Sequence, residues 1–566
     1  MSSQTSILNF KKTSVLLVFL VPALGGALFG YDIGATAFVV QQLQSADYSG
    51  RSSVTDTVAR NPILIGVIVA ISAVGAFCSS WIVFQLHDVI GRRHELRLGA
   101  ILYAIGASMA ALSGTSLVNI FMPGSTATVA ILLLIFGRFI FGCGIGFAMH
   151  GVSTSKILEL NLFNTRLNIL LFSSLCLSCF LFLSKNLQKA PTYIAEMSPH
   201  SIRGTLISLK EVAIVLGILF GYGLGYAMSH VVGGWMYQYG ASVFIALLDA
   251  GLTFFIPESA RWLILQGYQD EAQSSLAFVF ISDDGVEHAL QGMIESEQKG
   301  KQEKEKEATA NGSGQNSDNG SIFSPMRRAP LIAGVGLIVL QQITGQPSVL
   351  SYATVIFRKV GLGGLASVTL AVFKLLATIT AAITVERFGR KTLLYIGCSL
   401  MLVALLSLVT CLAHNDPMDD VMIDASDMNG FHSMGPRQVA TVLAMFVYIG
   451  GYQIGFGPIA WLMIGEVFPL SIRGQAVAFS VQINFGLNFV VQLLVPVLIS
   501  AIGLSSTFGL FSIFTGYSLF FVFRHVPETK GLTLEEIEEQ FRQDENDSNS
   551  IVDQAEPLIE STPLLA

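Results

Sequence analysis

Twelve apolar segments dominate this chain, and each is long enough to cross a lipid bilayer as a helix. A helix needs about 20 mostly apolar residues to span the hydrocarbon core of a membrane. The segments cover residues 14–38, 62–86, 96–113, 128–150, 206–228, 239–257, 330–350, 365–385, 392–413, 439–464, 476–501 and 505–525. Because backbone polar groups in lipid must be satisfied within each span, the sequence predicts an all-α membrane protein with about twelve transmembrane helices.

The composition excludes a soluble globular protein of this size. Hydrophobic residues make up 52% of the 566 residues and charged residues 13%, whereas about a quarter of the residues in soluble domains are charged. Much of the acid that gives the net charge of −7 lies in the tail from Glu528 onward. No long patch of Lys and Arg is present, so we expect no nucleic-acid partner.

The spans fall into two sets of six, separated by a polar segment. We expect an N-terminal six-helix bundle over residues 1–257 and a C-terminal six-helix bundle over 329–526. Residues 258–328 should form a linker of short surface helices and disorder, because they cannot bury enough apolar area to order fully. Residues 527–566 form a tail.

Basic residues in the short loops predict the orientation. They follow the second, fourth and eighth spans: Arg92, Arg93 and Arg97, then Arg203, then Arg387, Arg390 and Lys391. With an even number of crossings between these loops, all of them lie on one side, which the positive-inside rule makes cytosolic. Both termini and the linker are then cytosolic too.

Two motifs recur at matching places in the two halves. HDVIGRR at 87–93 follows the second span, and VERFGRK at 385–391 follows the eighth. AEMSPHSIRG at 195–204 precedes the fifth span, and GEVFPLSIRG at 465–474 precedes the eleventh. Such a repeat is typical of a duplicated transporter whose substrate site lies between the halves, near the middle of the membrane.

These motifs, with others along nearly the whole chain, resemble the sugar porters of the major facilitator superfamily. The matching strings are GALFGYDIG (26–34), DVIGRR (88–93), GR (137–138), PTYIAE (191–196), RG (203–204), PESARWL (257–263), QQITG (341–345), GPIAW (457–461), EVFP (466–469) and PETKGL (527–532). Two further strings, at 208–211 and 341–350, are similar to the plant vacuolar glucose transporter and D-xylose–proton symporter-like group. The resemblance implies the major facilitator fold and transport of a monosaccharide.

A sugar presents paired hydroxyl donors and acceptors, so its site needs amides, hydroxyls and an aromatic face rather than ions. Gln341 and Gln342 in the seventh span supply amides. Trp461 in the tenth span can stack on the C–H face of the ring, and Tyr352 can close the outer side. The alternative is that these polar groups only bond neighbouring helices.

The resemblance adds residues to this site and also marks departures from the family pattern. It implies that Asn484, Phe485 and Asn488 in the eleventh span complete the site. Pro347 stands where many sugar porters carry Asn, and Glu211 stands where glucose and xylose carriers usually have a sugar-binding Gln. The Glu211 carboxylate could accept sugar hydroxyls, carry a proton or pair with a neighbouring Lys or Arg, and the sequence leaves these alternatives open.

Charges within a membrane span are costly enough to suggest function. Asp32 in the first span and Arg138 in the fourth resemble the proton-coupling pair of xylose–proton symporters. An aspartate has a low proton affinity while an arginine lies beside it and a higher one when the arginine moves away. Proton binding can therefore be tied to a conformational change. The alternative is a permanent structural ion pair.

A set of charged residues next to the short loops is expected to form a gate. Its members are Arg92, Arg93, Glu196, Arg203, Arg390, Glu466 and Arg473. Ion pairs among them should hold the two halves together while the site faces outward, and breaking them should let the halves rock open inward. Only the network can bias this equilibrium, because an exposed ion pair alone contributes little.

Several activities are not expected. No G-x-x-x-x-G-K-[S/T] loop occurs, so direct use of ATP is not predicted, and GCGIG at 142–146 suits close helix packing better than a nucleotide loop. We expect no enzymatic activity, no cofactor and no metal site.

Near the C-terminus, Glu560, Leu564 and Leu565 fit an acidic dileucine signal for sorting adaptors, which indicates a vacuolar or endosomal membrane, with the plasma membrane as alternative.

Residues 152–189 are anomalous. In related sequences the segment ending at His150 runs almost directly into the string at 191–196, whereas here 38 residues intervene. Part of this insert, 167–184, is apolar enough to pass for a span, and an extra crossing would reverse every later loop. We interpret the insert as a retained intron, because VST at 152–154 can encode a splice donor; a true family-specific insertion is the alternative.

The favoured interpretation is secondary active transport of a hexose or pentose, coupled to protons by symport and working by alternating access in the lipid bilayer. The alternatives are a facilitative uniporter, a proton antiporter of the vacuolar membrane, a non-transporting sugar sensor and an inactive product of mis-splicing.

Overall fold

The computed structural model of the chain describes residues 10–45, 57–58, 61–86, 91–115, 126–150, 193, 197, 203–310, 328–359, 363–413, 435–468, 473–530, 532, 536–537 and 539–541. Over these residues the regular elements are helices, and the β-type pairing consists of one isolated bridge between Phe10 and Phe280. The all-α prediction is confirmed.

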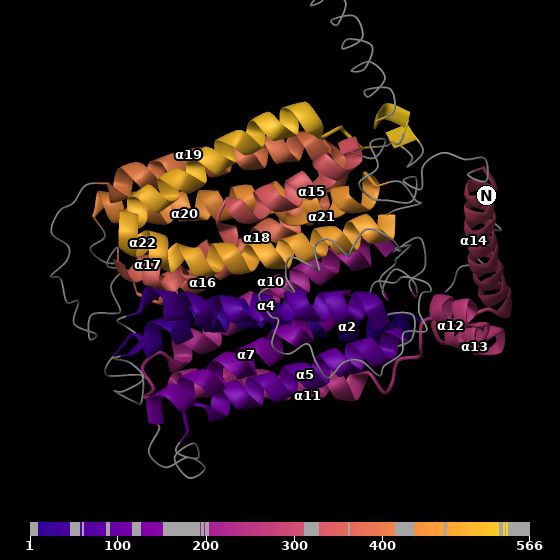
Figure 1. Cartoon of the computed structure of the whole chain (residues 1–566), viewed down its shortest axis with the longest axis horizontal. Helices are drawn as coiled ribbons and strands as arrows, with labels where there is room; N and C mark the ends of the chain where they lie inside the picture. Colours follow the sequence, from indigo (N-terminus) through magenta and orange to yellow (C-terminus); the bar gives the residue numbers. More distant parts are fainter. Residues whose placement is uncertain are drawn as a thin grey trace, which may run out of the picture.

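The first half of the chain forms a layer of long helices, which lies in the lower part of Figure 1. These helices are α2 (Lys12–Leu43), α4 (Pro62–Leu86), α5 (Arg92–Leu112), α7 (Thr126–His150), α10 (Arg203–Met228) and α11 (Gly234–Leu252), here called the first bundle. Within it α10 packs along α2, α7 packs against α4 and α5, and α11 packs against α5 and α2.

The second half lies above the first in Figure 1. It contains α15 (Arg328–Ile343), α16 (Gln346–Ser351), α17 (Ala353–Lys359), α18 (Leu365–Phe388), α19 (Arg390–Leu412), α20 (Pro436–Ile454), α21 (Phe456–Glu466) and α22 (Arg473–His525), here called the second bundle. The two bundles meet where α4 packs against α22, α10 against α18, and α2 against α16 and α17.

Glycines break two of the spans of the second bundle, and a third glycine separates two spans from each other. Gly345 has φ 91°, a conformation that a side chain would strain, so α15 ends before it and α16 begins after it with Pro347 in its first turn. Gly455 separates α20 from α21. Gly503, with φ 83°, divides the 53 residues of α22 into two spans. Broken helices of this kind mark binding sites in transporters.

The helices account for the predicted number of spans. Ten helical segments in the described part of the chain are long and apolar enough to cross a membrane. One of them, Phe479–His525, is long enough for two crossings and is interrupted at Gly503. The 19 residues of α11 add a further helix, which lies alongside α5 and α2. This arrangement agrees with a fold of about twelve helices in two halves.

Small residues let the helices approach closely. A Cβ atom on Gly30 of α2 would lie 1.8 Å from the carbonyl oxygen of Ile214 on α10. Likewise, a Cβ on Gly142 of α7 would lie 2.0 Å from the carbonyl oxygen of Ser72 on α4. These contacts require glycine, as is usual where membrane helices pack backbone to backbone.

The linker folds into α12 (Ala260–Gln266), α13 (Gln269–Val279) and α14 (Asp283–Ala310), at one end of the bundles in Figure 1. We call this the linker end and the opposite one the distal end. At 28 residues α14 is longer than a short surface helix. Its length follows from a sequence rich in Glu, Lys, Gln and Ala, which favour helix, and from apolar residues at Val286 and Leu290 that pack onto α12 and α13.

Candidate functional site

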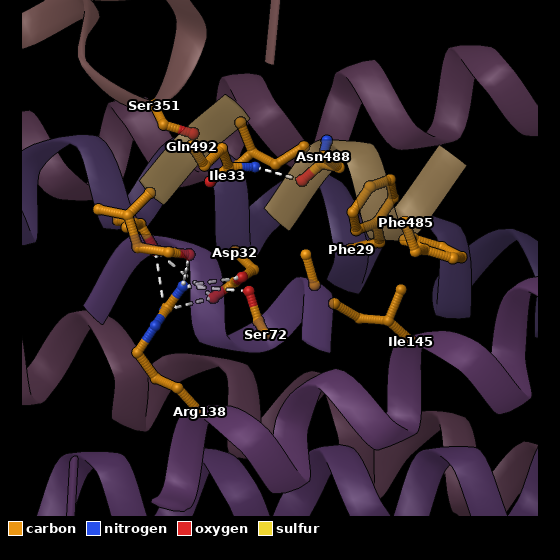
Figure 2. Close-up of a pocket in the computed structure, with 13 residues that line it drawn as sticks. Phe29, Asp32, Ile33, Ser72, Arg138, Ile145, Ser351, Phe485, Asn488 and Gln492 are labelled. Atoms are coloured by element: carbon orange, nitrogen blue, oxygen red, sulfur yellow. Dashed lines mark hydrogen bonds and ion pairs between the residues drawn. The ribbon is translucent and has the colours of Figure 1, made fainter. Parts of the chain in front are cut away.

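A pocket lies between the two bundles (Figure 2). It is lined by residues of α2, α4 and α7 from the first bundle and of α16 and α22 from the second. Four residues that were singled out from the sequence line it together: Asp32, Arg138, Phe485 and Asn488.

Asp32 and Arg138 form a bidentate ion pair on one side of this pocket. Arg138 Nη1 donates to Asp32 Oδ1 at 2.8 Å, and Nη2 donates to Oδ2 at 3.3 Å. The exposed fractions of the two side chains are 2% for Arg138 and 8% for Asp32. Two parallel bonds between ionised groups are among the stronger interactions of proteins, so the pair predicted from sequence is formed in this conformation.

Other groups complete the coordination of the guanidinium. Nη1 also donates to Thr36 Oγ1 at 2.9 Å and to the Tyr239 hydroxyl at 2.8 Å, and Nη2 donates to Ser72 Oγ at 3.3 Å. Nε donates to the carbonyl oxygen of Ile68. The sequence analysis missed these partners. Thr36 could have been found, because it lies four residues after Asp32 on the same helix face, but nothing local pointed to Tyr239 or Ser72.

A ladder of amides runs from the seventh span into the pocket. Gln342 Nε2 donates to Asn484 Oδ1, and Asn488 Nδ2 donates to Gln342 Oε1 at 3.2 Å. Gln492 Nε2 then donates to Asn488 Oδ1 at 2.5 Å, and the Tyr352 hydroxyl donates to the carbonyl oxygen of Gln492 at 3.2 Å. The structure therefore brings four predicted residues together. Gln492, the one missed, lies one helical turn beyond Asn488.

Gln341 lies beside this ladder and offers an acceptor. Its Nε2 donates to the carbonyl oxygen of Phe456 at 2.9 Å, a group that lies at the start of α21 beside the helix break at Gly455. Its Oε1 is buried and has no hydrogen-bond partner among the described residues, and the same is true of Ser348 Oγ on α16. Buried acceptors without partners are rare, and a ligand hydroxyl would satisfy them.

The aromatic residues lie at the junction of the bundles. Trp461 is half-buried and packs against two apolar clusters, each of which contains residues of both bundles. Phe485 of α22 belongs to the smaller of these clusters and contacts Phe29 of α2 edge to face, with ring centroids 6.3 Å apart (Figure 2). A sugar between the bundles would therefore meet aromatic faces from both sides.

Glu211 lies apart from the described lining of the pocket. It sits on α10, where that helix packs against α18 of the second bundle. Its carboxylate interacts electrostatically with Lys374 of α18 and with Lys210. Of the alternatives that the sequence left open for Glu211, these electrostatic partners favour pairing with a neighbouring lysine.

At the linker end, gate residues cluster within each bundle. Arg390 Nη2 donates to Glu466 Oε1 at 2.9 Å, which joins α19 to α21. Arg92 is fully buried in the first turn of α5, and Arg93 Nε donates to the carbonyl oxygen of Thr253 at 3.0 Å. Glu196 lies outside the described residues, as do the side chains of Arg203 and Arg473, which begin α10 and α22.

Two glutamates of the linker end, which the sequence analysis did not select, hold corresponding helix starts. Glu258 accepts the backbone N–H of Arg93 in the first turn of α5 at 2.9 Å. Glu528 accepts the backbone N–H of Arg390 in the first turn of α19 at 2.9 Å. A carboxylate is favoured at a helix N-terminus, where N–H groups are unpaired and the helix dipole is positive. The sequence signal was present, since both lie in the repeated PES and PET strings.

The sorting residues Glu560, Leu564 and Leu565 and the insert at 152–189 lie outside the described residues. The family comparison bears on the insert. Residues 18–157 and 186–541 match the family described as "Sugar (and other) transporter", so the match is interrupted within the anomalous segment.

Known proteins resemble the chain over nearly its whole length. It is 36% identical to "D-xylose-proton symporter-like 2" of Arabidopsis thaliana, a match that covers 94% of this chain and 91% of that protein. It is 30% identical to "D-xylose transporter" of Levilactobacillus brevis, over 94% of this chain and 97% of that protein.

A solved structure has the same fold. The xylose transporter XylE from E. coli, in a partially occluded inward open conformation, matches with a TM-score of 0.67 and 23% identity, over 92% of this chain and 100% of that chain. Together with the repeated motifs and the two helical bundles, these matches show that the chain belongs to the sugar (and other) transporter family and has the major facilitator fold.

Proposed function

We propose that this protein transports a monosaccharide across a membrane by alternating access, and that transport is coupled to protons by symport. The observation that carries the proposal is the buried Asp32–Arg138 pair, which lines the inter-bundle pocket together with Asn488. A proton requires an ionisable group, and a neutral polyol requires uncharged hydrogen-bonding groups; the ion pair and the neighbouring amide ladder supply one of each.

The sugar binds against the second bundle. The Gln341 and Gln342 amides, Asn484 and Asn488 present acceptors and donors for its hydroxyls, and the unpartnered Oε1 of Gln341 supports this role. Trp461 covers the C–H face of the ring. The amides bond to one another in this conformation. When a sugar binds, hydrogen bonds between amides are replaced by hydrogen bonds from the amides to the sugar hydroxyls, so the net free-energy cost is small.

Proton coupling follows from the position of Asp32. In the described conformation Arg138 neutralises its carboxylate through two bonds. A rearrangement that withdraws Arg138 leaves a buried carboxylate without a counter-charge, which then favours the protonated form. Proton binding and release are thereby linked to the state of the first bundle.

Contacts between the bundles close the distal end. Thr354 Oγ1 of α17 donates to the carbonyl oxygen of Ala37 on α2 at 2.5 Å. The Tyr222 hydroxyl of α10 donates to the carbonyl oxygen of Leu350 on α16 at 2.6 Å. These bonds break when the bundles rock toward the other state, while the charged residues of the linker end, among which Arg390 and Glu466 pair within the second bundle, supply the opposing gate.

The linker end is the cytosolic side, because the basic short loops precede or follow helices at this end. The dileucine-type residues Glu560, Leu564 and Leu565 support a vacuolar or endosomal membrane as the site of action.

Reconstituted vesicles test the proposal. We expect the chain to accumulate labelled D-xylose or D-glucose above equilibrium only when a pH gradient is imposed, and Asp32→Asn to lower that accumulation sharply while leaving equilibration. Asp249→Asn is the matched control, because Asp249 is another buried carboxylate of the first bundle but does not line the pocket; it should still accumulate sugar.

The result that would contradict the proposal is saturable uptake that only equilibrates in the unaltered protein, which would make it a uniporter. The same assay on a form that lacks residues 152–189 tests the insert. If only the shorter form transports, the insert is incompatible with function, as expected for a retained intron; equal transport by both forms would support a true insertion.

A further inference from the structure

A second buried charge lies in the second bundle, at Lys374 of α18. Its side chain is 3% exposed, and Nζ donates to Gln453 Oε1 on α20 at 2.9 Å. Nζ also lies 5.5 Å from the centroid of the Tyr452 ring. Gln453 is held in turn by a bond from its Nε2 to Thr378 Oγ1 at 2.7 Å. These partners are neutral, so they orient the ammonium group without cancelling its charge.

The opposite charge comes from the first bundle. Lys374 interacts electrostatically with Glu211 of α10, and α10 and α18 pack against each other. Lys210, the other cation near Glu211, belongs to the same helix as Glu211, and its stem faces Gly26 of α2. A buried ion needs a counter-charge, and the packing of α10 on α18 brings the Glu211 carboxylate toward the buried Lys374 ammonium across the interface of the bundles.

This pair differs from the Asp32–Arg138 pair in one respect that matters for transport. Asp32 and Arg138 both belong to the first bundle, so rocking of the bundles does not by itself separate them. Glu211 and Lys374 lie on different bundles, so the same motion changes their separation directly. When α10 and α18 move apart, Lys210 stays beside Glu211, but the counter-charge from the second bundle is withdrawn.

The surroundings of Glu211 connect it to the sugar site. Tyr452 of α20 interacts electrostatically with Glu211 and lies beside Gln341. The other ionisable side chains described on the helices packed against α10 are Lys12, Tyr31 and Asp32 of α2, Tyr237, Tyr239 and Asp249 of α11, and Arg387 of α18. Asp32 pairs with Arg138 within the first bundle, whereas Glu211 has a cation of the second bundle as an electrostatic partner.

We propose that Glu211 is a second proton-binding site on the transport path, and that Lys374 expels the proton when the bundles close on each other at α10 and α18. The inference rests on the proposed function. As the Lys374 ammonium approaches, the Glu211 carboxyl group releases its proton to water on the side that is then open, and the carboxylate pairs with the ammonium. On separation the carboxylate takes up a proton from the side to which it is exposed.

The consequence is a steeper dependence of accumulation on the pH gradient. The full chain is reconstituted into vesicles whose membrane potential is clamped at zero with K⁺ and valinomycin, and limiting accumulation of labelled D-xylose is measured against the imposed pH difference. One coupled proton gives about tenfold accumulation per pH unit, and two give about a hundredfold. We expect the unaltered protein to show the steeper slope.

Variants then locate the second proton. Glu211→Gln/Lys374→Gln removes both charges, so neither ion is left buried alone, and it should lower limiting accumulation by about tenfold per pH unit while uptake stays gradient-driven. Lys210→Gln is the matched control, because it removes the adjacent cation but keeps the pair across the interface. It should retain the steep slope.

Three outcomes are decisive. A tenfold slope in the unaltered protein would overturn the inference whether or not the double variant folds, and would leave the proposed function standing. A steep slope that persists in the double variant would also overturn it, because the second proton would then bind elsewhere. If neither the unaltered protein nor the form that lacks residues 152–189 accumulates sugar under any gradient, proton symport itself is refuted.

Discussion

Replacing Glu528 by Gln should loosen the linker end of the second bundle. The Glu528 carboxylate accepts four backbone N–H groups, from Arg390 at 2.9 Å, Lys391 at 3.1 Å, Thr529 at 3.0 Å and Lys530 at 3.1 Å. Three of these bonds go to Oε1 and the bond from Lys391 goes to Oε2. A glutamine keeps one acceptor oxygen and turns its NH₂ group toward at least one N–H.

The expected cost follows from that geometry. One N–H at the start of α19 loses its acceptor, at about 1–3 kcal/mol, and the helix N-terminus loses a compensating negative charge, at about 0.3–1 kcal/mol. The combined loss is about 2 kcal/mol. The carboxylate can lie this close to the helix start because residue 389 is glycine: its φ of 89° disfavours a side chain, and a Cβ there would lie 2.7 Å from Glu528 Oε2.

Thermal unfolding of the purified protein in detergent, followed by tryptophan fluorescence, measures this loss. We expect Tm to fall by about 4 °C, at about 2 °C per kcal/mol for a unit of some 200 residues. Glu258→Gln should have a similar effect, because Glu258 holds the start of α5 in the same way. Glu295→Gln on the exposed face of α14 is the control. A Glu528→Gln variant with the Tm of that control would refute the reasoning.

Three further predictions concern the pocket and the packing around it. Arg138→Met leaves the Asp32 carboxylate buried without a counter-charge, so we expect a loss of about 3–5 kcal/mol in stability and no sugar accumulation; unfolding in detergent and vesicle uptake measure both. Gln492→Ala removes the donor to the Asn488 ladder, which should raise KM for sugar severalfold, at about 1 kcal/mol per bond; an unchanged KM would contradict the ladder's role. Gly30→Val places a side chain against the backbone of α10 and should abolish folding, whereas Gly223→Val, with nothing within 4 Å of its Cβ, should be tolerated; size-exclusion profiles distinguish the two.

The corresponding glutamates give the fold a symmetry that the substrate site lacks. Glu258 and Glu528 bond to the first turns of α5 and α19, which begin at equivalent points of the two halves. The Asp32–Arg138 pair belongs to the first bundle, and the amide ladder to the second. Duplication has therefore preserved the helix starts at one end, while the two bundles carry different chemistry at the centre.

The sequence by itself determined the number of spans and the residues that carry the chemistry. Hydropathy sets which segments prefer lipid to water, and that preference is local, so α4, Pro62–Leu86, begins and ends at the predicted residues. Asp32 and Arg138 stood out for the same reason, because charge within an apolar segment is costly wherever the segment packs. The polar amides of α15 and α22 were visible as well.

Only the tertiary structure decided how these residues meet. Arg138 bonds to Ser72 and Tyr239 on two other helices, and Glu211 of α10 has Lys374 of α18 as an electrostatic partner. Such pairings depend on how each helix is rotated and how closely it approaches its neighbours, as at Gly30, where α10 packs directly against α2. Rotation and approach are set by contacts between segments far apart in the chain, and no local pattern in the sequence records them.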